Sequence, residues 1–367
     1  MFNRTLLAAA VTLVLSGMVH ADNMALIDQT GANNSVETTQ SAGTDNSSSV
    51  IQRGDKNVAL TSQEGAELTL TAEQSGYANE LLVEQAGYGS EAILSQYGTG
   101  HDINVYQATM GGTSYIEVAQ LGADNTTLVS QSGYEGGSYG VVNQDGQANL
   151  VNLKQSGYFN SIGVEQYGQT NVLKAAQGGG FVGANTYQSG TANTISLSQY
   201  ADIQGASTRI SQVGNDNDAS VGQSGGGRYS GGNINLVQNG DRNVGTVYDG
   251  SAMGSFTFTQ TGADNVLTAD QAGRSNSIVG MSSGDRNIVD IQQDGDGSSL
   301  DIVQNGSDNI IEASQGGSPY GDVGYIDQTG TANFASLTQG VAGSSFGTDT
   351  ATIIQNGSTN SATVSQR

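Results

Sequence analysis

The sequence predicts an all-β fold, a β-solenoid of about fifteen two-strand rungs with about 22 residues in each. Three observations predict it: a motif that recurs along the chain, alternation of apolar and polar residues between its copies, and a composition poor in bulky apolar side chains. The 367 residues include 54 glycines, one proline and no cysteine, and 35% are hydrophobic. Low hydrophobicity with a net charge of −23 is also typical of disorder, but a disordered chain keeps no strict period.

The motif is Q-x-G-x-x-N-x-x-x-x-x-Q, and internal repeats of this kind decide the whole fold. Its opening glutamine stands at Gln29, Gln52, Gln74, Gln96, Gln120, Gln144, Gln166, Gln188, Gln212, Gln238, Gln260, Gln304, Gln328 and Gln355. Its asparagine stands at Asn34, Asn57, Asn79, Asn125, Asn149, Asn171, Asn193, Asn217, Asn243, Asn265, Asn287, Asn309, Asn333 and Asn360. Its glycine is present in every copy, at Gly31, Gly54, Gly76, Gly98, Gly122, Gly146, Gly168, Gly190, Gly214, Gly240, Gly262, Gly284, Gly306, Gly330 and Gly357.

Each copy predicts two strands joined by a tight turn. Between Gln63 and Gln85 the residues Leu68, Leu70 and Ala72 alternate with polar ones, and a second such set follows the glycine. Alternation with a period of two indicates strands with these sets on one face. The glycine supplies the positive φ that a tight turn often needs. Insertions fall only in the other connection, as expected for a solenoid with one tight and one tolerant edge.

The glutamines and asparagines are predicted to lie inside, between two parallel, in-register sheets that face each other. A buried amide without partners costs about 1–3 kcal/mol. Amides of the same kind stacked at a cross-β spacing of about 4.7 Å can bond the copies on either side. The period therefore keeps like amides in register, in structural glutamine and asparagine ladders.

Two segments are expected in the chain. Residues 1–21 read as a secretory signal peptide, with a basic start, an apolar run from Leu6 to Met18 and a small-residue cleavage site before Asp22. Residues 22–367 form a single repeat domain. The acidic composition disfavours nucleic acid as a partner, and no later stretch is apolar enough to be membrane-embedded.

Both ends of the predicted stack are uncapped. The first strand starts at Asn23, directly after the expected cleavage site, and the last ends at Gln366. Open sheet edges are normally blocked by proline, charge or a covering helix. We therefore expect an amyloid-competent, head-to-tail homopolymer, a cross-β fibre.

The chain resembles the curlin repeat of bacterial curli subunits. Ser114–Asn125 carries the first part of that repeat, Gln52–Gln63 carries the second, and QYG at Gln96–Gly98 is also similar. The chain has more repeats than curlin subunits usually carry, and it lacks the glycine-rich segment that usually precedes the first repeat.

The resemblance implies a secreted fibre subunit on the surface of a Gram-negative bacterium, for biofilm matrix, adhesion and cell aggregation. It also implies partners: a nucleator subunit, an outer-membrane secretion pore and accessory factors. The last rung lacks a basic cluster, which favours the major fibre-forming subunit over the nucleator.

Five residues interrupt the ladders or place charge near them, and they are candidate gatekeepers that slow assembly until export is complete. They are His101, Asp249, Ser282, Asp322 and Asp349. Drift at tolerant rungs is the simpler interpretation. Charge gating predicts faster fibre growth as the pH falls towards about 4.

Other functions fit the sequence less well. A secreted monomeric β-solenoid that is an adhesin or binds or processes polysaccharides is the alternative, but no triad or clustered catalytic site is present, so we expect no enzyme. We expect neither a cofactor nor a metal: Asp294–Gly297 resembles a calcium-roll turn only faintly, because such rolls have a period of nine residues. An ice-binding surface would need a sustained threonine column, which the sequence lacks.

Overall fold

The computed structural model describes residues 10–15, 22–133, 136–201, 205–225, 231–316, 321–340 and 348–366. Within these residues every regular element is a β-strand, so no helix among them is long and apolar enough to span a membrane. The predicted signal peptide, apart from residues 10–15, lies outside the described residues, as do Tyr134, Pro319 and the insertions 226–230 and 341–347. The chain falls into two compact units, Met1–Ala176 and Gln177–Arg367.

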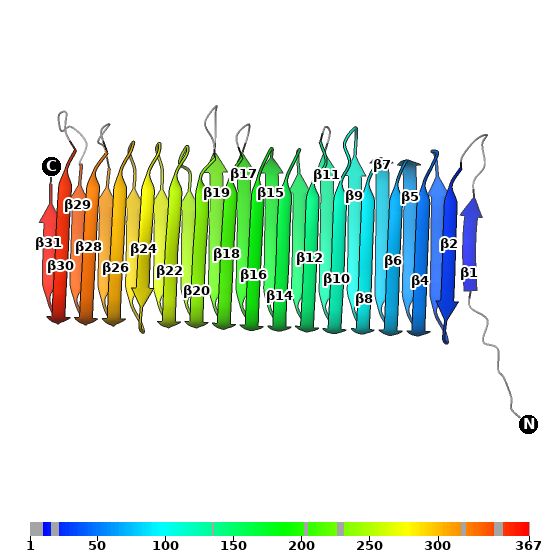
Figure 1. Cartoon of the computed structure of the whole chain (residues 1–367), viewed down its shortest axis with the longest axis horizontal. Coiled ribbons are helices and arrows are strands. Elements are labelled where there is room, and N and C mark those ends of the chain that lie inside the picture. The colour runs from blue at the N-terminus through cyan, green and yellow to red at the C-terminus, as the bar shows by residue number, and fades with distance from the viewer. Residues whose placement is uncertain are drawn as a thin grey trace, which may run out of the picture. The chain divides into compact units, whose positions relative to one another are not determined.

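In the first unit the even-numbered strands form one sheet (Figure 1). They are β2 (Met24–Thr30), β4 (Ser47–Asp55), β6 (Thr69–Tyr77), β8 (Glu91–Thr99), β10 (Tyr115–Ala123), β12 (Tyr139–Gln147) and β14 (Ser161–Gln169). The odd-numbered strands form the other sheet. They are β1 (Ala10–Leu15), β3 (Ser35–Ser41), β5 (Val58–Ala66), β7 (Glu80–Tyr88), β9 (Asp102–Thr109), β11 (Thr126–Gly133), β13 (Leu150–Ser156) and β15 (Val172–Gly179). The last residues of β15 belong to the second unit.

The second unit repeats this arrangement. Its even-numbered strands are β16 (Gly183–Thr191), β18 (Ser207–Asn215), β20 (Asn233–Asp241), β22 (Ser255–Ala263), β24 (Ser277–Ser283), β26 (Ser299–Ser307), β28 (Val323–Thr331) and β30 (Thr350–Ser358). Its odd-numbered strands are β17 (Thr194–Ala201), β19 (Asp218–Gly225), β21 (Val244–Asp249), β23 (Val266–Gln271), β25 (Ile288–Gln293), β27 (Ile310–Gln315), β29 (Phe334–Gln339) and β31 (Ser361–Ser365).

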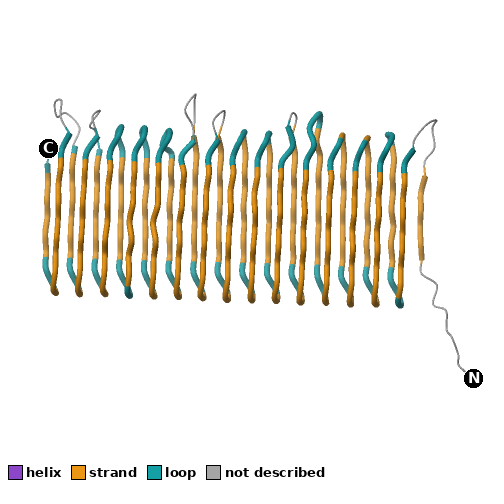
Figure 2. The backbone as a smooth tube through the Cα atoms, viewed as in Figure 1, coloured by secondary structure: helices purple, strands orange, loops and turns teal. Residues whose placement is uncertain are grey.

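The chain alternates between the two sheets, so each even strand and the odd strand after it make one rung (Figure 2). All pairing within the sheets is parallel, and equivalent motif positions are partners: Gln74 pairs with Gln52 on one side and with Gln96 on the other. In the second unit Gln238 pairs with Gln260 in the same way. The predicted β-solenoid with two parallel, in-register sheets is confirmed.

Alternation along each strand separates the core from the outer surface. In β6, Leu70 and Ala72 are 1% and 2% exposed, while Thr71 between them faces outwards. The core is a narrow seam of such small and medium apolar residues between the sheets. Two phenylalanines, Phe256 and Phe258 in β22, are its largest side chains.

The motif glycine is required by stacking as well as by the turn. Gly76 has φ +127°, where residues with a Cβ are strained. A Cβ on Gly76 would also overlap the carbonyl oxygen of Gly98 in the next rung. The sequence predicted the positive φ, and the structure adds this close approach of consecutive turns.

Candidate assembly interface

Glutamine side chains link consecutive rungs by amide hydrogen bonds. In the interior, Gln52 Nε2 donates to Gln74 Oε1 at 2.7 Å, and Gln74 Nε2 donates to Gln96 Oε1 at 2.8 Å. The second proton of Gln74 Nε2 goes to the Val58 carbonyl of the other sheet, at 3.0 Å. Each interior glutamine thus joins its rung to the next rung and one sheet to the other.

Two such ladders run through each unit. The opening ladder consists of motif-opening glutamines and is bonded in the first unit through Gln29, Gln52, Gln74, Gln96, Gln120, Gln144 and Gln166. In the second unit it is bonded through Gln188, Gln212, Gln238 and Gln260, and again through Gln304, Gln328 and Gln355. The closing ladder runs through Gln40, Gln63, Gln85, Gln107, Gln131 and Gln155 in the first unit. In the second unit it runs through Gln177, Gln199 and Gln223, and again through Gln271, Gln293, Gln315, Gln339 and Gln366.

The asparagines form a third ladder whose hydrogen bonds run the opposite way. Asn79 donates through its backbone N–H and its Nδ2 to Asn57 Oδ1 of the preceding rung, both at 3.1 Å. Asn57 Nδ2 in turn donates to the Gly76 carbonyl of the following rung, at 3.3 Å. The same asparagine-to-asparagine contact recurs in the second unit, where Asn309 donates to Asn287 and Asn333 donates to Asn309.

These directions make the two faces of a rung different. Towards the following rung, a rung presents glutamine N–H donors and an asparagine oxygen. Towards the preceding rung, it presents glutamine oxygens and an asparagine N–H. The first and last described rungs therefore carry complementary, unmatched groups.

The β2–β3 rung has unmatched glutamine oxygens. Gln29 and Gln40 donate to Gln52 and Gln63, but their own Oε1 atoms are buried without a hydrogen-bond partner. The core is also incompletely covered here, because Ile27 is half-buried whereas its register partner Val50 is fully buried. This rung is the acceptor end.

The β30–β31 rung has the unmatched donors. Gln355 and Gln366 accept hydrogen bonds from Gln328 and Gln339, while each Nε2 reaches only a backbone carbonyl, of Phe334 and Thr350. No described rung follows Asn360, so its Oδ1 lacks the donors that Asn333 Oδ1 receives. This rung is the donor end.

His101 replaces an asparagine and keeps the ladder intact. Its ring is buried, Nδ1 accepts the backbone N–H of Asn125 at 3.3 Å, and Nε2 lies 3.2 Å from the Tyr97 carbonyl. These partners require a neutral ring with its proton on Nε2. Burial lowers the pKa of His101, which favours this neutral form.

Asp249 replaces a closing glutamine and breaks the ladder. Its side chain is completely buried, and Oδ1 accepts hydrogen bonds from the backbone N–H and the hydroxyl of Ser251. Its Oδ2 has no partner, and neither has Oε1 of Gln271, which is its register partner in the next rung. Burial raises the pKa of Asp249, and the hydrogen bonds from Ser251 only partly offset this. A carboxylate has no proton to donate to Gln271, so two buried acceptors in neighbouring rungs remain without a donor.

The remaining three candidate gatekeepers differ from one another. Ser282 replaces an opening glutamine, is buried, and its hydroxyl donates to Gln304 Oε1 at 3.1 Å. Asp322 is buried at the tolerant edge, where Oδ1 accepts the backbone N–H of Asp349 at 3.2 Å and Oδ2 has no partner. Burial raises the pKa of Asp322. Asp349 is half-buried. Gating of assembly by these residues stays a prediction.

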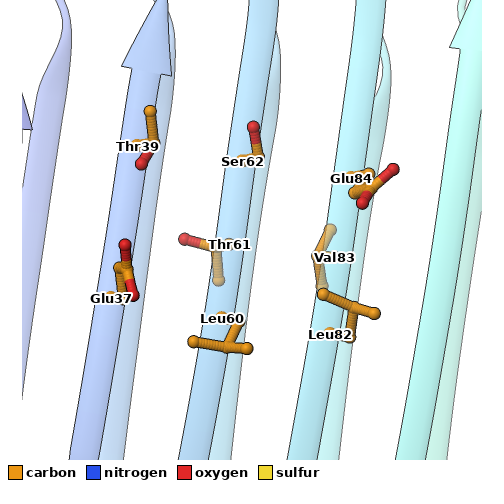
Figure 3. Close-up of a pocket in the computed structure, with 8 residues that line it drawn as sticks. All are labelled: Glu37, Thr39, Leu60, Thr61, Ser62, Leu82, Val83 and Glu84. Carbon is orange, nitrogen blue, oxygen red and sulfur yellow. The ribbon is translucent and has the colours of Figure 1, made fainter.

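Shallow hollows lie on the outer face of the odd-strand sheet. Figure 3 shows one on the odd-strand sheet of the first unit, lined by side chains of β3, β5 and β7 that include Glu37, Leu60 and Glu84. None of its lining residues is among the buried groups without a hydrogen-bond partner. Among the described residues, no group of three or more His, Cys, Asp or Glu side chains could hold a metal ion. Among the described residues, the buried polar atoms without a partner include Gln29 and Gln40 in the β2–β3 rung and Asp249, Gln271 and Asp322 at or beside substituted positions, besides Ser48 and Asn235.

Comparison with known families agrees with this geometry. The family model described as Curlin associated repeat matches residues 43–76, which span β4, β5 and most of β6. The chain carries a curlin repeat. The other copies share its motif spacing, and the resemblance expected from the sequence is confirmed. No curated protein matches the chain. A curlin repeat on a β-solenoid is typical of a structural protein related to curli amyloid rather than of a catalyst.

Sequence reasoning named the opening glutamines as site residues and gave less weight to the closing ones. The structure places Gln40 and Gln366 in the end rungs, with hydrogen bonds equivalent to those of Gln29 and Gln355. The signal was present, because the motif ends in glutamine as regularly as it begins. The orphaned oxygen of Gln271 had no sequence signal beyond the neighbouring substitution at Asp249.

Proposed function

We propose that this protein is a structural subunit that polymerises end to end into extracellular fibres of the curli type. The observation that carries the proposal is the pair of unmatched end rungs. Gln29 and Gln40 hold buried oxygens without donors, and Gln355 and Gln366, in the last described rung, donate only to backbone carbonyls. A second copy of the same chain is the partner that matches both ends.

The cellular role follows from the curlin repeat. Fibres of this kind serve biofilm matrix, adhesion and cell aggregation, and we propose the same role here, with the subunit secreted to the cell surface. A nucleator subunit, an outer-membrane pore and accessory factors are the proposed partners. Exposed ion pairs between consecutive rungs, Arg242–Asp264 and Arg286–Asp308 at 2.7 Å, add contacts along the stacking direction.

The test is fibre formation by the predicted mature chain from Asp22. Incubation at neutral pH should give thioflavin-positive fibres in electron micrographs and a meridional reflection near 4.7 Å. Soluble, monodisperse particles after days of incubation would contradict the proposal and favour a monomeric adhesin or polysaccharide-binding protein.

A further inference from the structure

We infer that Tyr115 and Tyr139 form a site of oxidative modification, at which a one-electron oxidant of the peroxidase type joins the two phenol rings by a carbon–carbon bond. Both residues lie on the outer face of the even-strand sheet in the first unit, in the neighbouring strands β10 and β12 (Figure 1). The link forms within one chain, so it goes beyond the proposed function and does not depend on it.

The fold holds the two rings against each other. Tyr115 and Tyr139 are register partners in the parallel pair of β10 and β12. Their ring centroids lie 4.9 Å apart, and the ring planes are 9° from parallel. The same column continues with Glu91 before the pair and with Ser161 after it, so the aromatic stack in this column consists of two rings. Because the rings are already in contact, their coupling is intramolecular and favoured by proximity.

The oxidant reaches the pair from solution, since Tyr139 is 50% exposed. Each phenol gives one electron to the oxidant and one proton to a base, and the two phenoxyl radicals join through ring carbons ortho to the oxygens. Each joined carbon then loses its hydrogen as a proton, while each oxygen takes a proton back. In total one carbon–carbon bond forms and two carbon–hydrogen bonds break. The two electrons and two protons released reduce one hydrogen peroxide to two molecules of water.

Glu117 provides the base for Tyr115. The Tyr115 hydroxyl donates to Glu117 Oε2 at 2.8 Å, which is within reach for proton transfer. Burial, the hydrogen bond and the charge of Glu117, and the neighbouring Tyr139 and Glu91 raise the pKa of Tyr115 to about 12. The phenol is therefore protonated at neutral pH, so its proton has to leave when the electron does. The carboxylate that already holds the hydrogen bond accepts this proton.

Two other exposed tyrosines of the first unit lack this arrangement. The Tyr97 hydroxyl also donates to a carboxylate, Glu73 Oε2 at 2.9 Å, but its register partners are a serine and a leucine. Tyr106 lies between a glutamate and a serine of the neighbouring strands. Tyr97 thus has a base without an aromatic partner, and Tyr106 has exposure alone, which makes both of them internal controls.

The link has a consequence for the solenoid. The two rings meet only when β10 and β12 are paired, so coupling fixes a pairing that folding has already made. The new bond also closes a loop that contains β11, and a cross-link of this kind restricts the unfolded chain. An oxidising environment would therefore add a covalent tie between two rungs after they have folded.

Photo-oxidation of the predicted mature chain from Asp22 tests the site. A ruthenium tris-bipyridyl sensitiser with persulfate supplies the one-electron oxidant under visible light, in a dilute mixture of isotope-labelled and unlabelled chains. Mass spectrometry of the digested chains locates linked tyrosines by the loss of two hydrogens. The link between Tyr115 and Tyr139 should be at least about tenfold more abundant than any link that includes Tyr97 or Tyr106. It should never join a labelled chain to an unlabelled one.

Single substitutions separate the roles of the residues. Tyr139→Phe keeps the ring but removes the phenol and should abolish the link, whereas the matched control Tyr106→Phe should leave it unchanged. Glu117→Gln keeps an oxygen that accepts from the Tyr115 hydroxyl but is no base, so the link should form at least about tenfold more slowly at neutral pH. At about pH 11 this difference should vanish or reverse, because the variant lacks a charge that raises the pKa of Tyr115 and a phenolate needs no base.

Two results would overturn the inference. If the link between Tyr115 and Tyr139 is no more abundant than links of Tyr97 or Tyr106, or joins labelled to unlabelled chains, chance encounters explain it and the site is wrong. If Glu117→Gln slows coupling equally at both pH values, Glu117 only positions the ring and is not the base. Because the pair lies within one chain, neither result depends on whether the chain forms fibres.

Discussion

The His101 rung in the first unit and the Asp249 rung in the second are both interrupted, yet only Asp249 leaves buried oxygens without a hydrogen-bond partner, its own and that of Gln271. His101 replaces an asparagine, and its neutral ring accepts from Asn125 through Nδ1 while Nε2 lies against the Tyr97 carbonyl. Asp249 replaces a glutamine and leaves Oδ2 and the facing Gln271 Oε1 without partners. The two side chains are equally buried, at 1% and 0% exposure, so burial alone does not explain the difference.

The comparison shows what a ladder position requires. An interior position must accept from one neighbouring rung and donate to the other, as an amide does. The neutral imidazole of His101 accepts from the following rung through Nδ1, and the hydroxyl of Ser282 still donates to Gln304. A carboxylate can only accept, so the rung following Asp249 has an orphaned oxygen. Whether a ladder position tolerates a substitution thus depends on the hydrogen-bonding capacity of the new side chain rather than on its shape or polarity.

The largest effect is expected for Asp249→Gln. Glutamine restores the donor towards Gln271 and removes a buried charge, so the local free energy of opening should rise by about 2–4 kcal/mol at neutral pH. Hydrogen exchange of the amides in β21 and β23 measures it. Asp290→Asn on the outer face of β25 removes the same charge and should change little.

The same Asp249→Gln chain also tests gating. If Asp249 slows assembly, the lag time of fibre growth should shorten relative to that of Asp290→Asn. A stabilised rung with an unchanged lag time would mean that the orphaned acceptors matter for the fold and not for assembly.

Acidification should change the local stability of the two rungs in opposite directions. The change is about 1.4 kcal/mol for each pH unit by which a folded-state pKa departs from its unfolded value. The pKa of His101 is lowered in the folded state. Its contribution to stability is therefore present above the unfolded pKa, near 6.5, and is lost as the pH falls through the folded pKa. The pKa of Asp249 is raised, so its contribution is complete below about 3.8 and is lost as the pH rises through the folded pKa. Protonated Asp249 gains the donor that Gln271 lacks.

Hydrogen exchange between pH 7 and 4, corrected for intrinsic rates, measures both rungs in one sample. Protection of the Asn125 amide should fall, and protection of β21 and β23 should rise. His101→Asn should abolish the first change and Asp249→Gln the second. A shift of both rungs in the same direction would show that the overall charge of the chain, rather than these two groups, controls the response.

The smallest effect is expected for Ser282→Ala. Loss of the hydroxyl leaves Gln304 Oε1 without its donor at 3.1 Å and should cost about 1 kcal/mol locally. Ser283→Ala, at the neighbouring half-buried position, is the matched control. If Ser282→Ala costs nothing, water or a neighbouring amide replaces the donor, and the requirement inferred from Asp249 is weaker than proposed.

The sequence by itself determined the rung. Alternation with a period of two places Leu70 and Ala72 inside. The recurrence of Gln74 and Gly76 at a fixed spacing sets the register of the strands and the position of the turns. Both patterns are periodic along the sequence, so they can be recognised without the structure. A single repeat domain over residues 22–367 stays a prediction.

The tertiary structure decided how consecutive rungs meet. Three relations of this kind join residues more than twenty positions apart. The first is the direction of each amide hydrogen bond, and the second is the overlap that a Cβ on Gly76 would make with Gly98. The third is the position of the Phe258 ring, which lies where a Cβ of its register partner Gly280 would be. The same holds for the orphaned oxygens of Asp249 and Gln271. The physical reason is that a hydrogen bond needs a donor and an acceptor at a particular distance, and only stacking one rung on the next brings those atoms together.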